Sequence, residues 1–447
     1  MKRRNLYIGV ALAILSITAC KPTLDEFTPS AGTKADFSKY IAIGNSLSAG
    51  FADGGLYLEG QKVAFPLLIA EQLQKVGGGE FKSPFFSEEQ SNGSGYIRLK
   101  ALVNGQPVTE QVADKLAYRS ATPKLLIKYT EPINNLGVPG MRMDMAFAPG
   151  IGTAAGNMYF ERLLPDGTPP TMNYFTYSTS QNHTFFTFSL GNNDALGWAT
   201  NGGVVKINPT TKEPDPTTVL TATSTFDARL NTYVTELTKG GQKGVLATIP
   251  DVTAVPYFTT VTRELLIAGV NAANPSAGVK DIYIRTKNGT RAATNADYFI
   301  LPFSSAGLLG RTDIPDEKTN IVNPYPYGLD PRNGVGDQFV LDVTEAAEVV
   351  ARVNAFNKTI KSVAASKGLA VADVNAFLTS VKNGIRIDGL AVSAKYITGN
   401  GFSLDGIHLT PIGNALMANV FIEAINKTYG AQVPRLNISD FRGVKLP

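Results

Sequence analysis

The sequence contains only two histidines, His183 and His408, and they limit the acid–base chemistry available to the chain near neutral pH. His408 lies in the stretch DGIHLTPIGN, three residues after Asp405 and directly before an expected helix start. An aspartate at this spacing can accept a hydrogen bond from one imidazole nitrogen and fix the tautomer of the ring. His408 is therefore the candidate general base, and Asp405 is the residue that would orient it.

A candidate nucleophile lies near the other end of the chain. Ser46 follows the apolar run 40–43 in the stretch GNSLS, where Gly44 permits a tight turn before the next helix. Taken alone, this serine could equally be a helix N-cap. A serine nucleophile needs a base, and His408 is the histidine that can serve it.

Two further segments offer donors of the kind that stabilise an oxyanion. Gly140 ends the stretch NLGVPG and Asn193 lies in GNND. A well-placed backbone N–H or side-chain amide is worth roughly 3–4 kcal/mol to a transition state, although either residue alone is an ordinary turn former. His183 stands before the strand that Asn193 follows. At about 3.3 Å per strand residue, His183 would lie roughly 20 Å from Asn193, so we expect His183 to have a structural role.

These segments meet at one edge if the strands before them are parallel. Short apolar or β-rich runs that end in Gly, Asn, Asp or Pro recur along the chain. They occupy residues 40–43, 132–140, 183–194, 244–252 and 369–375. Helical patterns alternate with them, most clearly at 342–368, which opens with a capping box, and at 410–430, where Thr410 precedes Pro411. This alternation predicts a parallel sheet covered on both faces.

Long polar stretches rich in Gly, Pro, Thr and Asn separate these elements at 141–182, 199–225 and 252–335. They follow the carboxyl ends of expected strands, the edge at which open α/β sheets place ligand sites. They either shape a substrate pocket or elaborate the surface. Their aromatic side chains could line a pocket, but packing in the interior is the favoured interpretation. These aromatic residues are Tyr159, Phe160, Tyr174, Phe175 and Tyr177.

Taken together, these segments resemble the sequence blocks of the SGNH, or GDSL-like, hydrolase family. The four sequence blocks of that family correspond, in order, to GNSLS, NLGVPG, GNND and DGIH. The resemblance implies that Ser46 is the nucleophile, His408 its base and Asp405 the partner of the base. It also implies an oxyanion hole made by the N–H groups of Ser46 and Gly140 and the side chain of Asn193. No metal or other cofactor is expected.

The resemblance further implies an α/β fold, a three-layer α/β/α sandwich with a five-stranded parallel sheet in flavodoxin-like order. Residues 37–447 would form one such domain with the insertions given above. Two positions depart from the family pattern: Asn45 replaces an aspartate, and Pro139 replaces a small polar residue but leaves the N–H of Gly140 free. The rival α/β-hydrolase fold is disfavoured, because Ser48 stands where its G-x-S-x-G elbow needs glycine.

The amino terminus has the pattern of a secretory signal over residues 1–19, with a basic start and an apolar run that ends at ITAC. This ending resembles the lipobox of bacterial lipoproteins, which implies cleavage before Cys20 and lipid on its thiol. Residues 20–36 would then be a flexible tether. We therefore expect an exported protein with a lipid anchor in a bacterial membrane, the outer membrane, on its periplasmic face or at the cell surface.

Net charge narrows the choice of partners. The formal charge is +4, and removal of the three basic residues of the signal leaves +1, so nucleic acid binding has no electrostatic support. We expect a monomer that acts as a serine esterase or lipase on an ester-containing small molecule, a lipid or an acylated glycan. The alternatives are an acyltransferase or carbohydrate O-acetyl esterase with the same residues, and a non-catalytic surface lipoprotein that binds glycans or lipids.

Overall fold

The protein is described here by a computed structural model that covers residues 27–103, 106–316 and 320–447. The predicted signal peptide and lipidated Cys20 lie outside the described residues, as does the first part of the 20–36 tether.

A parallel sheet lies at the centre of the fold. Its regular strands are β1 (Tyr40–Gly44), β6 (Phe185–Ser189), β7 (Lys243–Ala247) and β12 (Ala370–Ala372), in the order β1-β6-β7-β12. Every residue of β1 and β6 is buried, as expected for the continuous apolar runs of strands that are covered on both faces. Gly44 pairs with Ser189, so both strands end at the same edge of the sheet.

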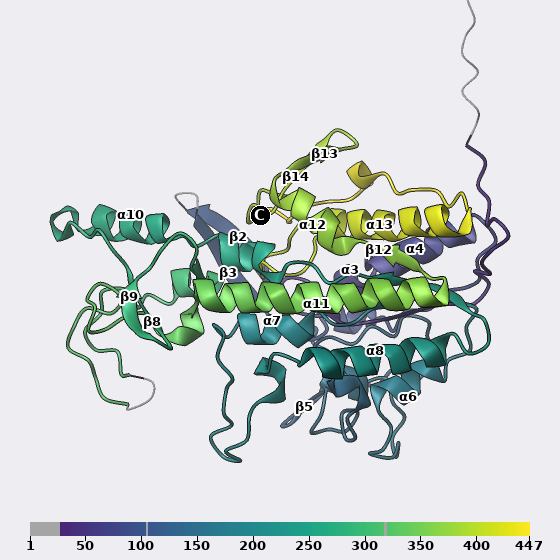
Figure 1. Ribbon diagram of the computed structural model, residues 1–447, viewed down its shortest axis with the longest axis horizontal. Coiled ribbons are helices and arrows are strands. Elements are labelled where there is room, and N and C mark those ends of the chain that lie inside the picture. The colour runs from purple at the N-terminus through teal and green to yellow at the C-terminus, as the bar shows by residue number, and fades with distance from the viewer. Residues whose placement is uncertain (1–26, 104–105, 317–319) are drawn as a thin grey trace, which may run out of the picture.

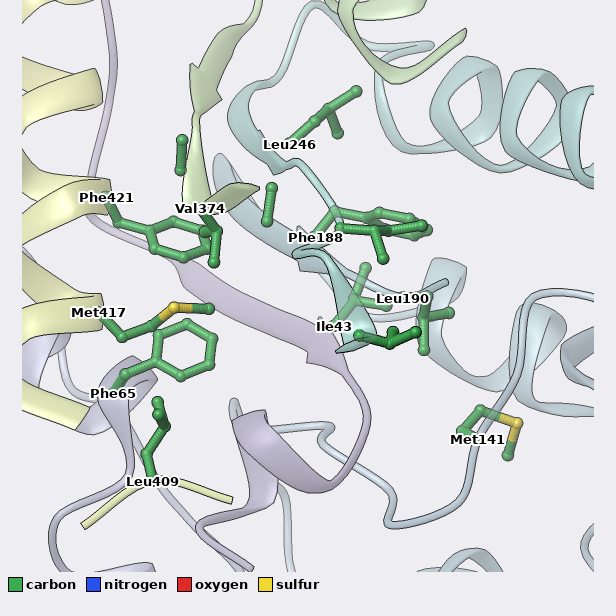
Figure 2. Close-up of a cluster of buried hydrophobic side chains, with 14 of the residues drawn as sticks. Ile43, Phe65, Met141, Phe188, Leu190, Leu246, Val374, Leu409, Met417 and Phe421 are labelled. Carbon is green, nitrogen blue, oxygen red and sulfur yellow. The ribbon is translucent and has the colours of Figure 1, made fainter. Parts of the chain in front are cut away.

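Two pairs of helices cover the sheet (Figure 1). They are α4 (Phe65–Gln74) with α13 (Pro411–Tyr429), and α8 (Thr223–Leu237) with α11 (Val343–Lys367). Stacked rings join the helices of each pair, with centroid distances of 5.0 Å for Phe65 and Phe421 and 4.0 Å for Phe226 and Phe356. Figure 2 shows part of this core, where Phe421 and Met417 reach from α13 toward the strands. The structure is thus an α/β fold, as the sequence predicted.

The two helices that the sequence predicted most clearly are present. α11 begins after Asp342, whose side chain accepts hydrogen bonds from the first turn while Glu345 completes the capping box. It ends at Gly368, which has a φ of 62°. α13 begins after Thr410, whose Oγ1 accepts a hydrogen bond from the N–H of Gly413 at 3.1 Å. Local capping signals therefore set the helix ends.

The segment expected as a further strand, residues 132–140, is irregular. Three backbone hydrogen bonds of 2.8 to 3.1 Å join it to Ala42 and Gly44 of β1, but it forms only a single parallel bridge. One reason is that Asn135 uses its side chain to bond the carbonyl of Ser48 and the N–H of Gly137, in competition with a regular ladder. The central sheet therefore has four regular strands in the described chain, where the sequence predicted five.

The polar insertions 141–182 and 252–335 fold into short elements, whereas 199–225 contains only the 3₁₀ turn Pro216–Thr218 ahead of α8; α10 projects with β8 and β9 at one end of the molecule (Figure 1). The elements of the insertions are α5 (Met158–Glu161), α6 (Tyr174–Thr179), α9 (Pro256–Thr259), α10 (Arg263–Ala273), β8 (Tyr283–Thr286), β9 (Gly289–Ala292) and β10 (Tyr298–Phe299), which pairs with β11 (Val340–Leu341). Two hairpins that the sequence did not predict are β2 (Tyr96–Val103) with β3 (Gln106–Val112), and β4 (Tyr118–Ala121) with β5 (Lys124–Leu126). The remaining helices and strands are α2 (Ser46–Ala49), α3 (Leu58–Gln61), α7 (Asn193–Ala199), α12 (Val374–Lys382), β13 (Ile385–Ile387) and β14 (Leu390–Val392).

The aromatic residues of the 141–182 insertion pack against the core, as the sequence favoured. Tyr174 is fully buried, and its hydroxyl accepts a hydrogen bond from the N–H of Gly44 at 3.2 Å and donates to the carbonyl of Leu136 at 2.7 Å. The insertion is therefore fastened to the end of the strand that leads to Ser46.

The substitution Tyr174→Phe tests this link. Loss of the hydroxyl leaves a buried N–H and a buried carbonyl without that partner, so we expect the free energy of unfolding to fall by about 1–3 kcal/mol. Urea unfolding followed by circular dichroism measures the change. Tyr177→Phe is the matched control, since the Tyr177 hydroxyl bonds no residue of the described chain. Equal stability losses in the two variants would contradict the link.

Candidate active site

The structure brings Ser46 and His408 together from positions 362 residues apart in the sequence. Ser46 is the first residue of α2, directly beyond β1, and His408 lies in the loop before α13. The Nε2 atom of His408 lies 2.8 Å from the Oγ atom of Ser46, and its Nδ1 atom lies 2.8 Å from Oδ2 of Asp405. The three side chains form a continuous hydrogen-bonded chain, the arrangement that activates a serine nucleophile.

The environment of Asp405 keeps it ionised. Its side chain is 14% exposed, and this burial raises the pKa, but the positive charge that His408 carries when protonated and the hydrogen bonds from His408 and from the N–H of Ile407 outweigh burial and hold the pKa well below its usual range. The N–H of Gly54 adds a further hydrogen bond to Oδ2 at 2.9 Å. A carboxylate at this position requires a proton on Nδ1 of the imidazole, which leaves Nε2 free to accept the proton of Ser46.

The turn that presents Ser46 explains both Gly44 and Asn45. A Cβ atom on Gly44 would lie 2.0 Å from the Oγ of Ser48, so only glycine fits there. Asn45 caps α2, because its Oδ1 accepts a hydrogen bond from the N–H of Leu47 at 3.1 Å. An aspartate could accept the same bond. Asparagine in its place removes a negative charge next to the nucleophile and leaves a buried Nδ2 without a partner among the described residues.

The donors predicted for an oxyanion are two backbone N–H groups, of Ser46 and Gly140, and the side-chain amide of Asn193. The N–H groups of Ser46 and Gly140 donate to no acceptor within the described chain, and Gly140 has a φ of 77° at an exposed turn. Asn193 borders the same cavity as Ser46 and His408. Its Nδ2 donates one hydrogen bond to the carbonyl of Met141 at 3.0 Å, which ties it to the Gly140 loop and leaves its second N–H for a ligand.

A buried ionic network that the sequence analysis missed holds these donors. The Arg142 side chain is 1% exposed and donates to both carboxylate oxygens of Asp144, at 2.9 and 2.8 Å, and to the carbonyl of Asn193 at 3.0 Å. Asp194 accepts a hydrogen bond from the N–H of Met143 at 2.7 Å. Burial and the charge of Asp144 raise the pKa of Asp194 to about 6 despite the nearby arginine. The only sequence signal was the position of these charges within four residues of Gly140 or Asn193.

A second set of contacts holds the loop that carries Asp405. Asp53, at the unusual φ of 53°, accepts hydrogen bonds from the N–H of Leu404 at 2.8 Å and from the hydroxyl of Tyr57 at 2.7 Å. The ring of Phe51 packs against that of His408 with 4.7 Å between centroids. The loop after α2 therefore packs against one side of the loop that carries Asp405 and His408.

His183 lies away from this site, before the start of β6. It is 7% exposed, and its ring nitrogens lie 2.8 Å from the carbonyl oxygen of Gln181 and 3.0 Å from that of Leu237. These contacts join β6 to the end of α8 and agree with the structural role expected from the sequence.

No protein-family model matches the chain, and no curated protein matches it at a significant level. Across residues 27–103, 106–316 and 320–447, no three His, Cys, Asp or Glu side chains are grouped so that they could hold a metal ion. In the same part of the chain, no helix has both the length and the apolar character needed to cross a membrane.

The substitution Asp405→Asn tests the role of the carboxylate. An amide can donate to Nδ1 and so stabilise the wrong imidazole tautomer, and we expect the rate at which a fluorophosphonate labels Ser46 to fall by about 10⁴-fold. Labelling followed by gel fluorescence over time measures the rate. Asp440→Asn, at an exposed position near the carboxyl terminus, should label at the wild-type rate. Unchanged labelling of Asp405→Asn would show that the carboxylate does not orient His408.

The substitution Arg142→Met tests the buried network. It leaves the carboxylates of Asp144 and Asp194 without their cation, so we expect the free energy of unfolding to fall by about 3–5 kcal/mol. Adding Asp194→Asn removes one uncompensated charge and should restore at least about 1 kcal/mol. Urea unfolding measures each variant. Arg98→Met breaks only an exposed ion pair and should leave the free energy of unfolding close to that of the wild type. If the double variant loses as much stability as the two single substitutions combined, Arg142 does not compensate the charge of Asp194.

Proposed function

We propose that this chain is a serine hydrolase that cleaves carboxylic esters through an acyl-enzyme on Ser46, and that it is a member of the SGNH family. The observation that carries the proposal is the hydrogen-bonded chain from Ser46 through His408 to Asp405, with both distances at 2.8 Å. The unpaired donors around Ser46 support the same conclusion, because a serine hydrolase must stabilise an oxyanion as well as generate a nucleophile.

The first half of the reaction makes the acyl-enzyme. The Oγ atom of Ser46 attacks the ester carbonyl while Nε2 of His408 takes its proton, and the negative charge of Asp405 stabilises the resulting imidazolium. The carbonyl oxygen becomes an oxyanion, which accepts hydrogen bonds from the N–H groups of Ser46 and Gly140 and from the Asn193 amide. The C–O bond to the alcohol then breaks, and the imidazolium gives its proton to the departing alcohol oxygen.

The second half releases the acid. A water molecule gives a proton to Nε2 of His408 and attacks the acyl carbon, and the same donors stabilise the second oxyanion. The bond to Ser46 breaks as the imidazolium returns the proton to Oγ. The products are one carboxylic acid and one alcohol, and the enzyme is regenerated. Acyl transfer would use the same steps, with an alcohol in place of water.

We also propose the finer architecture that the family would have. The three backbone hydrogen bonds between residues 132–140 and β1 support counting this segment as a fifth strand at the β1 edge. The strand order, numbered along the chain, would then be 2-1-3-4-5, which is the flavodoxin-like order. The helix pairs on the sheet would be the outer layers of an α/β/α sandwich. The signal and lipobox pattern supports an exported lipoprotein, and we further propose that it is a monomer at the outer membrane.

Hydrolysis of a panel of p-nitrophenyl esters tests the function. We expect Ser46-dependent turnover, with kcat reduced by about 10⁴-fold or more in Ser46→Ala and in His408→Ala. Ser180→Ala, at an exposed position, serves as the matched control and should keep wild-type activity. An added alcohol that diverts the acyl group from free acid to a new ester would identify a transferase. Turnover that survives in Ser46→Ala would contradict the proposal.

A further inference from the structure

A small apolar cavity opens directly onto the reactive atoms. Ser46, His408 and Asn193 border it, and its volume is about 40 Å³. Apart from Asn45 and Asn192, the rest of its lining is apolar, with side chains from α2, α7, α12, α13, the segment after β7 and the loop 402–409. Apolar side chains beside a nucleophile suit the hydrocarbon part of a substrate, whose burial is favourable by the hydrophobic effect.

The cavity has a closed floor. Val374 and Met417 are 1% and 3% exposed and belong to the main core, and Figure 2 shows both of them within one packed cluster. Val252 and Val255, which are 4% and 6% exposed, close another side. Protein cores are close-packed, so these walls do not yield space to a long chain at low cost. If each atom-sized group of a ligand occupies about 10–15 Å³, the cavity has room for roughly three such groups.

We propose that this cavity binds the acyl chain and restricts the enzyme to esters of short, unbranched acids, from acetyl to about butyryl. This inference rests on the proposed function, since it assigns a pocket to the acyl-enzyme on Ser46. The acyl group is held through both halves of the reaction, whereas the alcohol must leave and water must enter after it. A closed apolar pocket suits the group that stays, and an open side suits the group that leaves.

Leu378 is the side chain that controls the size of this pocket. It follows Val374 by four residues, so the two lie on the same face of α12 and both line the cavity. Val374 is buried at the floor, whereas Leu378 is only partly buried and can be changed with less effect on the core. A smaller residue at 378 should lengthen the pocket, and a larger one should shorten it.

The experiment measures kcat/KM for p-nitrophenyl esters with acyl chains of two, four, six and eight carbons, using the full chain. A missing or extra methylene in an apolar pocket changes the rate by about 10- to 200-fold, so we expect at least a tenfold fall from butyrate to octanoate. Leu378→Ala should raise the octanoate-to-acetate ratio by about tenfold or more, and Leu378→Phe should lower the butyrate-to-acetate ratio by a similar factor. Thr379→Ala, exposed on the same helix, should leave both ratios unchanged.

A second series, with acetyl esters of alcohols of increasing length, separates the acyl and alcohol assignments. If the Leu378 variants change the dependence on alcohol length and not on acyl length, the acyl assignment is overturned. A wild-type preference for octanoate, or Leu378 variants with unchanged ratios, would also overturn it while Ser46-dependent turnover leaves the proposed function intact. Absence of Ser46-dependent turnover on every ester would overturn the proposed function and this inference with it.

Discussion

The hydrogen bond between Ser46 and His408 constrains the rest of the structure, because it joins residues near the two ends of the chain. It requires the carboxyl end of β1 and the loop before α13 to meet at one edge of the sheet. A parallel sheet meets this requirement, since its strands all deliver their following loops to the same edge. The start of α13 also helps to position His408, because the helix begins at its cap, Thr410, two residues after the histidine.

The site depends on clamps as well as on the sheet. The loop after α2 holds the Asp405 side chain through Gly54 and holds Leu404 through Asp53, so the nucleophile and the catalytic loop are positioned by one segment. On the other side, Arg142 joins the Gly140 turn to the carbonyl of Asn193. Buried charges such as Arg142 and its carboxylate partners are costly unless they are fully paired. They lie where the positions of the Gly140 and Asn193 donors have to be held fixed.

The sequence predicted the elements whose signals are local. Buried apolar runs identified β1 and β6, and a capping box and a Thr-Pro pair identified the starts of α11 and α13. The triad could be predicted because histidine is scarce and His408 has an aspartate three residues before it. The Arg142 network and the role of Asp53 could not, because their partners are distant in sequence and only packing brings them together. The 132–140 segment departed from a regular strand because Asn135 bonds the backbone nearby.

The proposed mechanism requires a covalent acyl intermediate on Ser46, which mass spectrometry of the rapidly quenched enzyme would detect. After brief reaction with an ester that deacylates slowly, we expect one acyl group on the peptide that contains Ser46, and none in Ser46→Ala. An acyl group on a different residue, or steady turnover with no acyl group on the protein, would contradict it.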